Sequence, residues 1–276
     1  MTAIQAVVLS IVQGITEFLP VSSSGHLILV PWFLGWPDQG LDFDIATNTG
    51  TLLAIVAYFH RDLRDLITGF FTGAPRSRDG EFVPRTMAWN LVLGTIPAGL
   101  AGLALHDWIA TEARNPRLIA GTTLFYGLLL FVADRIGRKD RALGDLWWRD
   151  ALVIGIAQAL ALVPGTSRSG ITITAALLLG LTRPAAATFT FLLSVPIGVL
   201  VAAHDAKKLF LPKVPAAHPL TSHDLAMMGI GIVVSALVGY GVIAWLLNWL
   251  RRRSLTVFVV YRVLLAAVIL AALASR

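Results

Sequence analysis

Two short segments of this sequence gather the side chains that could bind and cleave a phosphate group. The first holds Gln13, Glu17, Ser22, Ser23, Ser24 and His26, and the second holds Thr166, Ser167, Arg168, Ser169 and Thr172. Serine hydroxyls, one arginine and the unpaired backbone N–H groups at the start of a helix form a cradle for phosphate. Two such cradles that face each other would suit a diphosphate, and this is the chemistry that we predict.

Glu17 is the carboxylate of the first segment. Gln13 lies four residues earlier, so both side chains fall on one face of a helix. A carboxylate beside a bound phosphate makes chemical sense if it acts as a base, or if a divalent cation bridges it to the phosphate oxygens. We therefore expect Glu17 to be catalytic or to bind Mg²⁺ or Ca²⁺.

The composition indicates that these segments lie within a membrane. The 276 residues are 56% hydrophobic and 14% charged, whereas about 25% of a soluble domain is charged. The absence of cysteine excludes disulfides and thiolate catalysis. We attribute the net charge of +6 to cytoplasmic loops and expect no nucleic-acid partner.

The apolar stretches predict an all-α integral membrane protein with six full transmembrane helices. A span needs about 20 apolar residues. We place the six spans at 43–60, 88–106, 118–135, 185–203, 226–250 and 256–274. Two further apolar regions, 4–35 and 150–181, are interrupted by Pro, Gly and Ser and are predicted to form re-entrant helix-loop-helix hairpins.

The two interrupted regions also predict an internal repeat. Gln13, Ser22, Ser24 and Gly25 recur at a constant offset as Gln158, Ser167, Ser169 and Gly170. Three spans separate the hairpins, so the second must enter from the opposite face. We therefore predict one membrane domain over 1–276, with halves of about 1–140 and 146–276 in an inverted-topology repeat.

The distribution of Lys and Arg predicts the orientation. Most of these residues lie in the loops 61–87 and 134–149 and in the turn 251–253, which are therefore predicted to be cytoplasmic. Both termini and the loops 107–117 and 204–224 then face outward.

Each of these side chains also has a structural interpretation. Glu17 and Arg168 could form an ion pair that only stabilises the fold, although charges inside a membrane are costly and usually functional. The serines could hold helices together, and His26 could be a packing residue. Asn48, Tyr261 and Arg262 lie within spans, but nothing local distinguishes them from packing partners.

Two segments resemble the signatures of the undecaprenyl-diphosphate phosphatase family of the bacitracin-resistance type. They read Gln13-x-x-x-Glu17-Phe-Leu-Pro-Val-Ser-Ser-Ser-Gly-His26 and Pro164-Gly-Thr-Ser-Arg-Ser-Gly-x-Thr172. The resemblance extends to 43–50, 183–196 and 261–262. It implies a multi-pass enzyme of the bacterial inner membrane whose active site faces the periplasm. Such an enzyme removes the terminal phosphate of undecaprenyl diphosphate with a divalent metal, recycles the carrier for peptidoglycan synthesis and confers bacitracin resistance.

The resemblance also implies roles for individual residues. Arg168 would bind phosphate. The family's acidic motif falls on Gln13 and Glu17, and its first position is Gln here, a variant that the pattern allows, which shifts metal binding or the role of base toward Glu17. Ser23 would be the nucleophile, with His26 as a competing nucleophile or acid/base and direct attack by water as a third alternative. Gln13, Ser22, Ser24, Thr166, Ser167, Ser169 and Thr172 would bind the substrate.

A lipid or anion transporter, or a flippase, is the alternative function, because inverted repeats with broken helices are also typical of transporters. An enzyme that also flips its lipid product is compatible with the sequence as well. The sequence leaves the oligomeric state open, with a homodimer among the alternatives.

Overall fold

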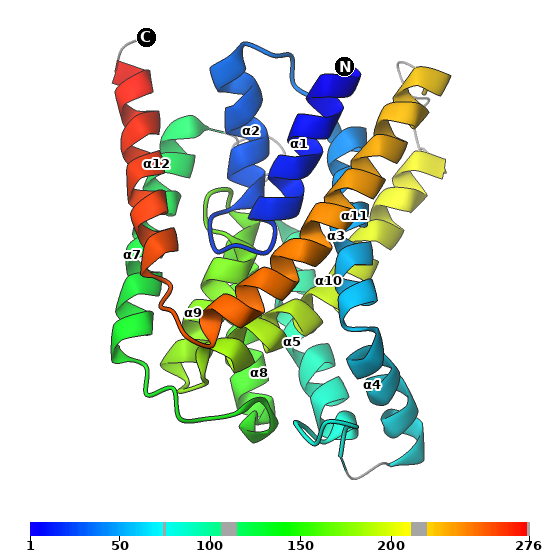
Figure 1. Cartoon of the computed structure of the whole chain (residues 1–276), viewed down its shortest axis with the longest axis vertical. Helices are drawn as coiled ribbons and strands as arrows, with labels where there is room; N and C mark the ends of the chain where they lie inside the picture. Colours follow the sequence, from blue (N-terminus) through cyan, green and yellow to red (C-terminus); the bar gives the residue numbers. More distant parts are fainter. Residues whose placement is uncertain (74–75, 106–114, 211–219, 275–276) are drawn as a thin grey trace.

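The computed structural model describes residues 1–73, 76–105, 115–210 and 220–274, which form helices and no strands (Figure 1). The α-helices are α1 (Ala3–Thr16), α2 (Ser23–Leu34), α3 (Leu41–Tyr58), α4 (His60–Thr72), α5 (Pro84–Ala104), α7 (Pro116–Ile136), α8 (Trp148–Ala159), α9 (Arg168–Leu178), α10 (Arg183–Phe210), α11 (Ser222–Leu250) and α12 (Thr256–Ala274). Two short 3-10 helices, η1 (Leu143–Asp145) and η2 (Leu160–Leu162), flank α8. The loops 107–117 and 204–224, which we expected to face outward, lie largely outside the described residues.

Five of these helices are long and apolar enough to cross a membrane, namely α5, α7, α10, α11 and α12. They coincide with five of the six predicted spans, and the chain is an all-α, multi-pass membrane protein. The sixth predicted span, 43–60, corresponds to α3. This helix has 18 residues and carries Asp42 and Asp44 in its first turn, and it is not one of the five.

The interrupted regions form two pairs of short helices. Helices α1 and α2 have 14 and 12 residues, and α8 and α9 have 12 and 11. A 14-residue helix is about 21 Å long, which is less than the ~30 Å core of a bilayer. The chain turns between the members of each pair near the middle of the molecule, and α1 and α8 begin at opposite ends of it (Figure 1). The predicted breaks are confirmed in position, although each second helix already begins inside its break.

Residues 61–87, which we treated as a loop, contain α4, so that prediction is wrong for their first part. Leu66 and Gly69 are buried where α4 packs against α5, while Ile67 and Phe71 are exposed. The high density of charge in this stretch concealed the helical spacing of its apolar residues.

The helices before and after residue 140 pack in corresponding ways. Helix α1 packs on α11, and its counterpart α8 packs on α5. Likewise α3 packs on α11, and α10 packs on α5. Two further contacts, α3 with α10 and α7 with α12, join the two sets of helices along two seams. Both pairs of short helices lie between these seams, so the two breaks meet at the centre of the molecule.

Candidate active site

The two breaks share an unusual backbone geometry. Ser22 and Ser167 adopt φ angles of +77° and +73°, a region that residues other than glycine rarely enter. Each is the N-cap of the helix that follows, and its hydroxyl accepts a hydrogen bond from Gly25 N at 3.4 Å or from Gly170 N at 3.1 Å. The same turn is therefore built twice, and it starts two helices whose positive N-terminal ends converge on one place.

Glu17 lies at that place and joins the two breaks. It is the C-cap of α1, and its Oε2 accepts hydrogen bonds from Ser23 Oγ at 2.5 Å and from Gln13 Nε2 at 3.0 Å. Its Oε1 forms an ion pair with Arg168 Nη2. The carboxylate thus contacts the first residue of α2 and the first residue of α9. The predicted proximity of Gln13 and Glu17 on one helix face is confirmed.

The ion pair that we weighed as a structural alternative is present, but it is not sealed in the core. Glu17 and Arg168 line a cavity of about 180 Å³ between α3 and α10, together with Asn48 and Ser194. The Arg168 side chain retains 29% of its exposure and that of Glu17 retains 10%. A fully buried ion pair stabilises a fold weakly, because desolvation offsets the attraction. An anion that enters this cavity can reach the guanidinium, so the arrangement suits binding.

Gln13 contacts the carboxylate through its Nε2 and carries a buried oxygen on the same amide group. It is fully buried, and its Nε2 also donates to Asn48 Oδ1 at 2.7 Å. Its Oε1 has no hydrogen-bond partner within the described part of the chain. A buried acceptor without a donor is costly, and a hard cation is one group that could satisfy it. Among the described residues, no three His, Cys, Asp or Glu side chains cluster to hold a metal by themselves.

His26 points away from Ser23. Its Nδ1 lies 2.7 Å from Ser22 O, and its Nε2 lies 2.5 Å from the Tyr261 hydroxyl, on which the ring also stacks. Both ring nitrogens are therefore engaged by groups other than Ser23 and Glu17. This geometry makes His26 a support for the turn at Ser22.

The remaining predicted binding residues mostly hold the backbone of the breaks in place. Ser169 Oγ donates to Leu19 O at 2.9 Å and so links the second break to the first. Thr172 Oγ1 donates to Arg168 O at 2.7 Å and accepts from Thr190. Thr166 is fully buried, and its hydroxyl has no partner among the described residues. Ser24 is exposed and lies 3.4 Å from the Ser22 hydroxyl.

Arg262 on α12 is the residue whose importance the sequence did not reveal. It is fully buried, and it donates to carbonyl oxygens of both breaks: to Pro20 at 3.1 Å, to Gly165 at 2.9 Å and to Thr166 at 3.1 Å. It also donates to Thr123 O on α7 at 2.9 Å. The signal that could have found it is a charge inside an apolar span, which is functional by default.

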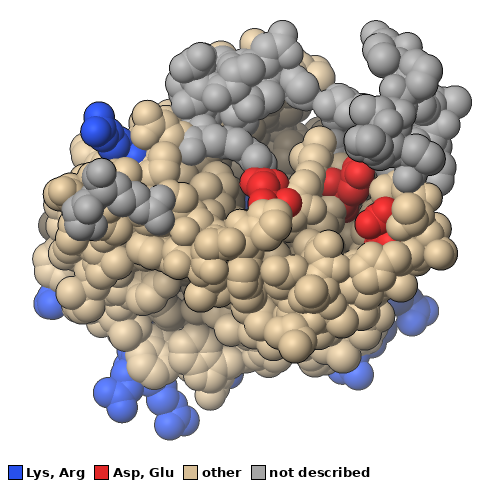
Figure 2. Space-filling view, turned by 90° about the horizontal axis from the view of Figure 1, so that it is seen from above, with Lys and Arg blue, Asp and Glu red and all other residues tan. Residues whose placement is uncertain are grey.

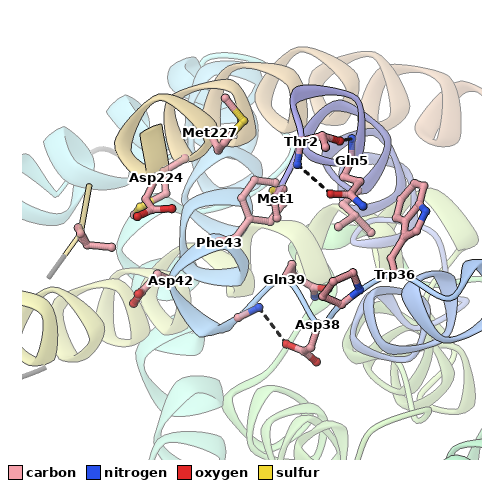
Figure 3. Close-up of a pocket in the computed structure, with 15 residues that line it drawn as sticks. Met1, Thr2, Gln5, Trp36, Asp38, Gln39, Asp42, Phe43, Asp224 and Met227 are labelled. Atoms are coloured by element: carbon pink, nitrogen blue, oxygen red, sulfur yellow. Dashed lines mark hydrogen bonds between the residues drawn. The ribbon is translucent and has the colours of Figure 1, made fainter. Parts of the chain in front are cut away.

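A larger pocket of about 500 Å³ is lined by Met1 and Thr2 and therefore lies at the end of the molecule that holds the N-terminus (Figure 3). Asp42 of α3 and Asp224 of α11 lie on one side of it, and Trp36 lies on the other. Asp38 also lines it, and acidic side chains gather near the middle of this face (Figure 2). Three aspartates would repel a diphosphate, so the smaller cavity at Glu17 and Arg168 is the better candidate active site.

Known proteins resemble this chain over nearly its whole length. The family model described as bacitracin resistance protein BacA matches residues 6–268. The undecaprenyl-diphosphatase of Magnetococcus marinus is 51% identical over 275 residues, which cover 99% of this chain and 100% of that protein. The undecaprenyl-diphosphatase of Moorella thermoacetica is 48% identical, and undecaprenyl-diphosphatase 2 of Stutzerimonas stutzeri is 47% identical, each with 98% of both chains covered.

Proposed function

This chain belongs to the bacitracin resistance protein BacA family, and we infer that it is an undecaprenyl-diphosphatase of the membrane. It hydrolyses undecaprenyl diphosphate to undecaprenyl phosphate and inorganic phosphate, the activity for which its curated relatives are named. The family favours this enzyme over a lipid or anion transporter. Recycling of the carrier lipid for peptidoglycan synthesis and resistance to bacitracin are the proposed consequences.

The observation that carries the chemistry is the position of one carboxylate between a hydroxyl and a guanidinium. Glu17 accepts from Ser23 Oγ at 2.5 Å and pairs with Arg168. A base in contact with a hydroxyl can activate it, and an arginine beside both can hold the phosphate under attack. We propose that Arg168 exchanges Glu17 for an oxygen of the terminal phosphate when the substrate enters the cavity.

In the proposed first step, Ser23 Oγ attacks the terminal phosphorus while Glu17 takes its proton. The bond between this phosphorus and the bridging oxygen breaks, and its electron pair leaves with undecaprenyl phosphate. Glu17 then returns the proton to the departing oxygen. In the second step, water attacks the phosphoserine, Glu17 accepts a proton from the water, and Ser23 Oγ leaves and recovers that proton. Most of the acceleration comes from donors already fixed around the phosphate.

The geometry supports Ser23, or a water in its place, over His26 as the nucleophile. Ser23 contacts the only carboxylate of the two breaks, whereas both nitrogens of His26 are bound to Ser22 and Tyr261. Trapping the labelled terminal phosphate on Ser23 by rapid acid quench would establish the covalent route. If no labelled phosphate is found on Ser23 while the enzyme turns over, direct attack by water is favoured.

A divalent cation, Mg²⁺ or Ca²⁺, fits the oxygens at Glu17. The carboxylate and the unpartnered Gln13 Oε1 offer hard ligands, and Mg²⁺ commonly binds through one or two carboxylates together with substrate phosphates. When bound, it would offset the charge of the diphosphate. We propose that Glu17 is the principal ligand and that the substrate supplies most of the others.

We further propose that the chain lies in the bacterial inner membrane with this site open to the periplasm. The described parts of the arginine-rich segments 61–87 and 134–149 lie at the end opposite the termini (Figure 1), as the positive-inside rule expects for the cytoplasmic side. The corresponding packing of the helices supports one domain over 1–276 that is an inverted repeat of about 1–140 and 146–276, with six spans and two re-entrant hairpins. A homodimer stays a prediction.

The function is tested by measuring phosphate release from undecaprenyl diphosphate by the purified protein in detergent. Wild type and Arg168→Ala would be measured with and without EDTA. We expect release by wild type that EDTA abolishes, and a loss of about 10²- to 10³-fold in kcat/KM in the variant, because a fixed donor to the transition state is removed. A well-folded wild type that releases no phosphate from this lipid would contradict the proposal.

A further inference from the structure

The two seams between the halves are filled in different ways. At the seam between α7 and α12, Arg262 occupies the space, and a Cβ added at Gly127 would lie 3.1 Å from its Cβ and Nε atoms. At the seam between α3 and α10, the cavity at Glu17 and Arg168 opens between the helices. One seam is therefore closed by a side chain, and the other has room for a ligand.

We propose that the isoprenyl chain of the diphosphate substrate leaves the active site through the seam between α3 and α10, and that Leu52 and Gly198 set the width of this exit. The inference rests on the proposed function, because it assigns a path to the lipid part of that substrate. It makes these two residues determinants of chain-length specificity.

The cavity wall has both polar and apolar lining residues. Its polar residues are Glu17, Asn48, Thr49, Thr51, Arg168 and Ser194, and the diphosphate would bind at the charged ones. Its apolar residues are Ile45, Leu52, Ile55, Gly198, Val201 and Ala202. An amphiphile with an anionic head and a hydrocarbon chain can contact both kinds of lining residue, whereas a free inorganic anion has no apolar group to contact the apolar ones.

The cavity is far too small for the whole substrate. A volume of about 180 Å³ holds on the order of six water molecules, which is enough for a head group with the start of its chain. The remainder of an undecaprenyl chain must therefore leave the protein. Val201 lines the cavity and is itself 48% exposed, and its neighbours Val199 and Leu200 are more than half exposed. The wall thus continues onto an apolar surface for which lipid is the natural solvent.

Leu52 and Gly198 face each other across this seam and both line the cavity. Pro196 lies two residues before Gly198 within α10 and has no N–H to donate to the preceding turn. A Cβ added at Gly198 would lie 2.9 Å from Leu52 Cδ1, and the Leu52 side chain is flexible. The Leu52 side chain therefore fills the space that Gly198 leaves, and it is the group that would move to let the hydrocarbon pass.

The test compares undecaprenyl diphosphate with farnesyl diphosphate as substrates of Gly198→Leu. A longer side chain at this position fills the exit but leaves Glu17, Ser23 and Arg168 untouched. We expect the ratio of kcat/KM for the long substrate to that for the short one to fall by about tenfold or more, because a pocket that gains bulk discriminates at this scale. Activity on farnesyl diphosphate serves as the internal measure of correct folding.

Two further variants make the result decisive. Leu52→Ala combined with Gly198→Leu should restore the ratio, because the first change removes the bulk that the second adds. Gly241→Leu is the matched control: Gly241 is also a helical glycine, an added Cβ there meets nothing within 4 Å, and the ratio should stay at the wild-type value.

The outcomes separate the two proposals. A wild type that releases phosphate from neither lipid contradicts the proposed function. A wild type that cleaves both, together with an unchanged ratio in Gly198→Leu, overturns the assigned path. So does an equal loss on both substrates that Leu52→Ala fails to reverse.

Discussion

The two breaks of this molecule have nearly the same backbone and different chemistry. Ser22 and Ser167 cap α2 and α9 with the same positive φ and the same hydroxyl contact to the glycine three residues later. The side chains differ at two pairs of corresponding positions. The first break has Glu17 and Ser23, and the corresponding residues of the second are Leu162 and Arg168.

This difference shows which features of the site both breaks must supply and which only one break must supply. Two helix N-termini are useful together, because each adds partial positive charge for a diphosphate. A second carboxylate without a cation beside it would repel the anion and would disfavour the ionised form of the first. One carboxylate that contacts both first residues, Ser23 and Arg168, serves the whole site. We therefore interpret the first break as the source of the base and the second as the source of the positive charge.

The strongest test of this division removes the single carboxylate. Glu17→Gln keeps the size of the side chain but cannot accept the Ser23 proton, and we expect kcat/KM to fall by about 10³-fold. Leu162→Ala, at the corresponding position of the second break, is the control and should change kcat/KM by less than about threefold, like most substitutions away from the chemistry. Initial rates of phosphate release measure both. Equal losses in the two variants would refute the division of roles.

The next test concerns the group that holds the two breaks in register. Arg262 donates to Pro20 O in the first break and to Gly165 O at the corresponding position of the second. Lysine keeps the charge but cannot present a planar fork of donors. For Arg262→Lys we expect kcat to fall by about 10²-fold, the scale of a small misplacement of reacting groups, while KM changes little.

The readout that separates positioning from folding is the comparison of kcat with thermal stability. Phosphate release at saturating substrate would be measured beside the melting temperature in detergent. A variant that melts like the wild type and has lost kcat supports positioning. Wild-type kcat in Arg262→Lys would show that the breaks keep their register without the guanidinium.

The parts of the fold that depend on local pattern could be predicted from the sequence. Long apolar runs located the spans, and Pro, Gly and Ser inside such runs located the breaks. Helical spacing placed Gln13 beside Glu17. The constant offset between the breaks predicted that Ser22 and Ser167 would correspond, and their backbone angles agree with this. Each of these inferences needs only neighbours along the chain.

The contacts that depend on distant parts of the chain could not be predicted. Arg262 donates to carbonyl oxygens of residues 96 to 242 positions away. Every residue has a backbone carbonyl, so the sequence does not show which of them accept these hydrogen bonds. Tyr261, which occupies His26 Nε2, lies 235 positions from it. The sequence therefore left His26 and Ser23 as rivals, and only the fold shows that His26 faces elsewhere. The helix α4 was missed for a different reason. The many charged residues of 61–87 indicated a loop, although its apolar residues have helical spacing.

Substitutions at Ser22 and Ser167 test whether the positive φ costs the same conformational energy in both breaks. We expect these substitutions to change the stability of the protein only slightly. A serine with positive φ is strained, whereas glycine is not. Replacing Ser22 or Ser167 by alanine removes the cap, worth about 1 kcal/mol, and keeps the strain, so stability falls. Replacing either by glycine loses only a few tenths of a kcal/mol of capping and relieves the strain, so stability rises.

The four melting temperatures in detergent should therefore show the same signs at both positions. The alanine variant should lose slightly more at Ser167, whose hydroxyl lies 3.1 Å from Gly170 N, than at Ser22, where the corresponding distance is 3.4 Å. Opposite signs at the two serines would mean that the similar angles arise from different local forces. The two breaks would then match in shape without sharing the balance of capping and strain that holds it.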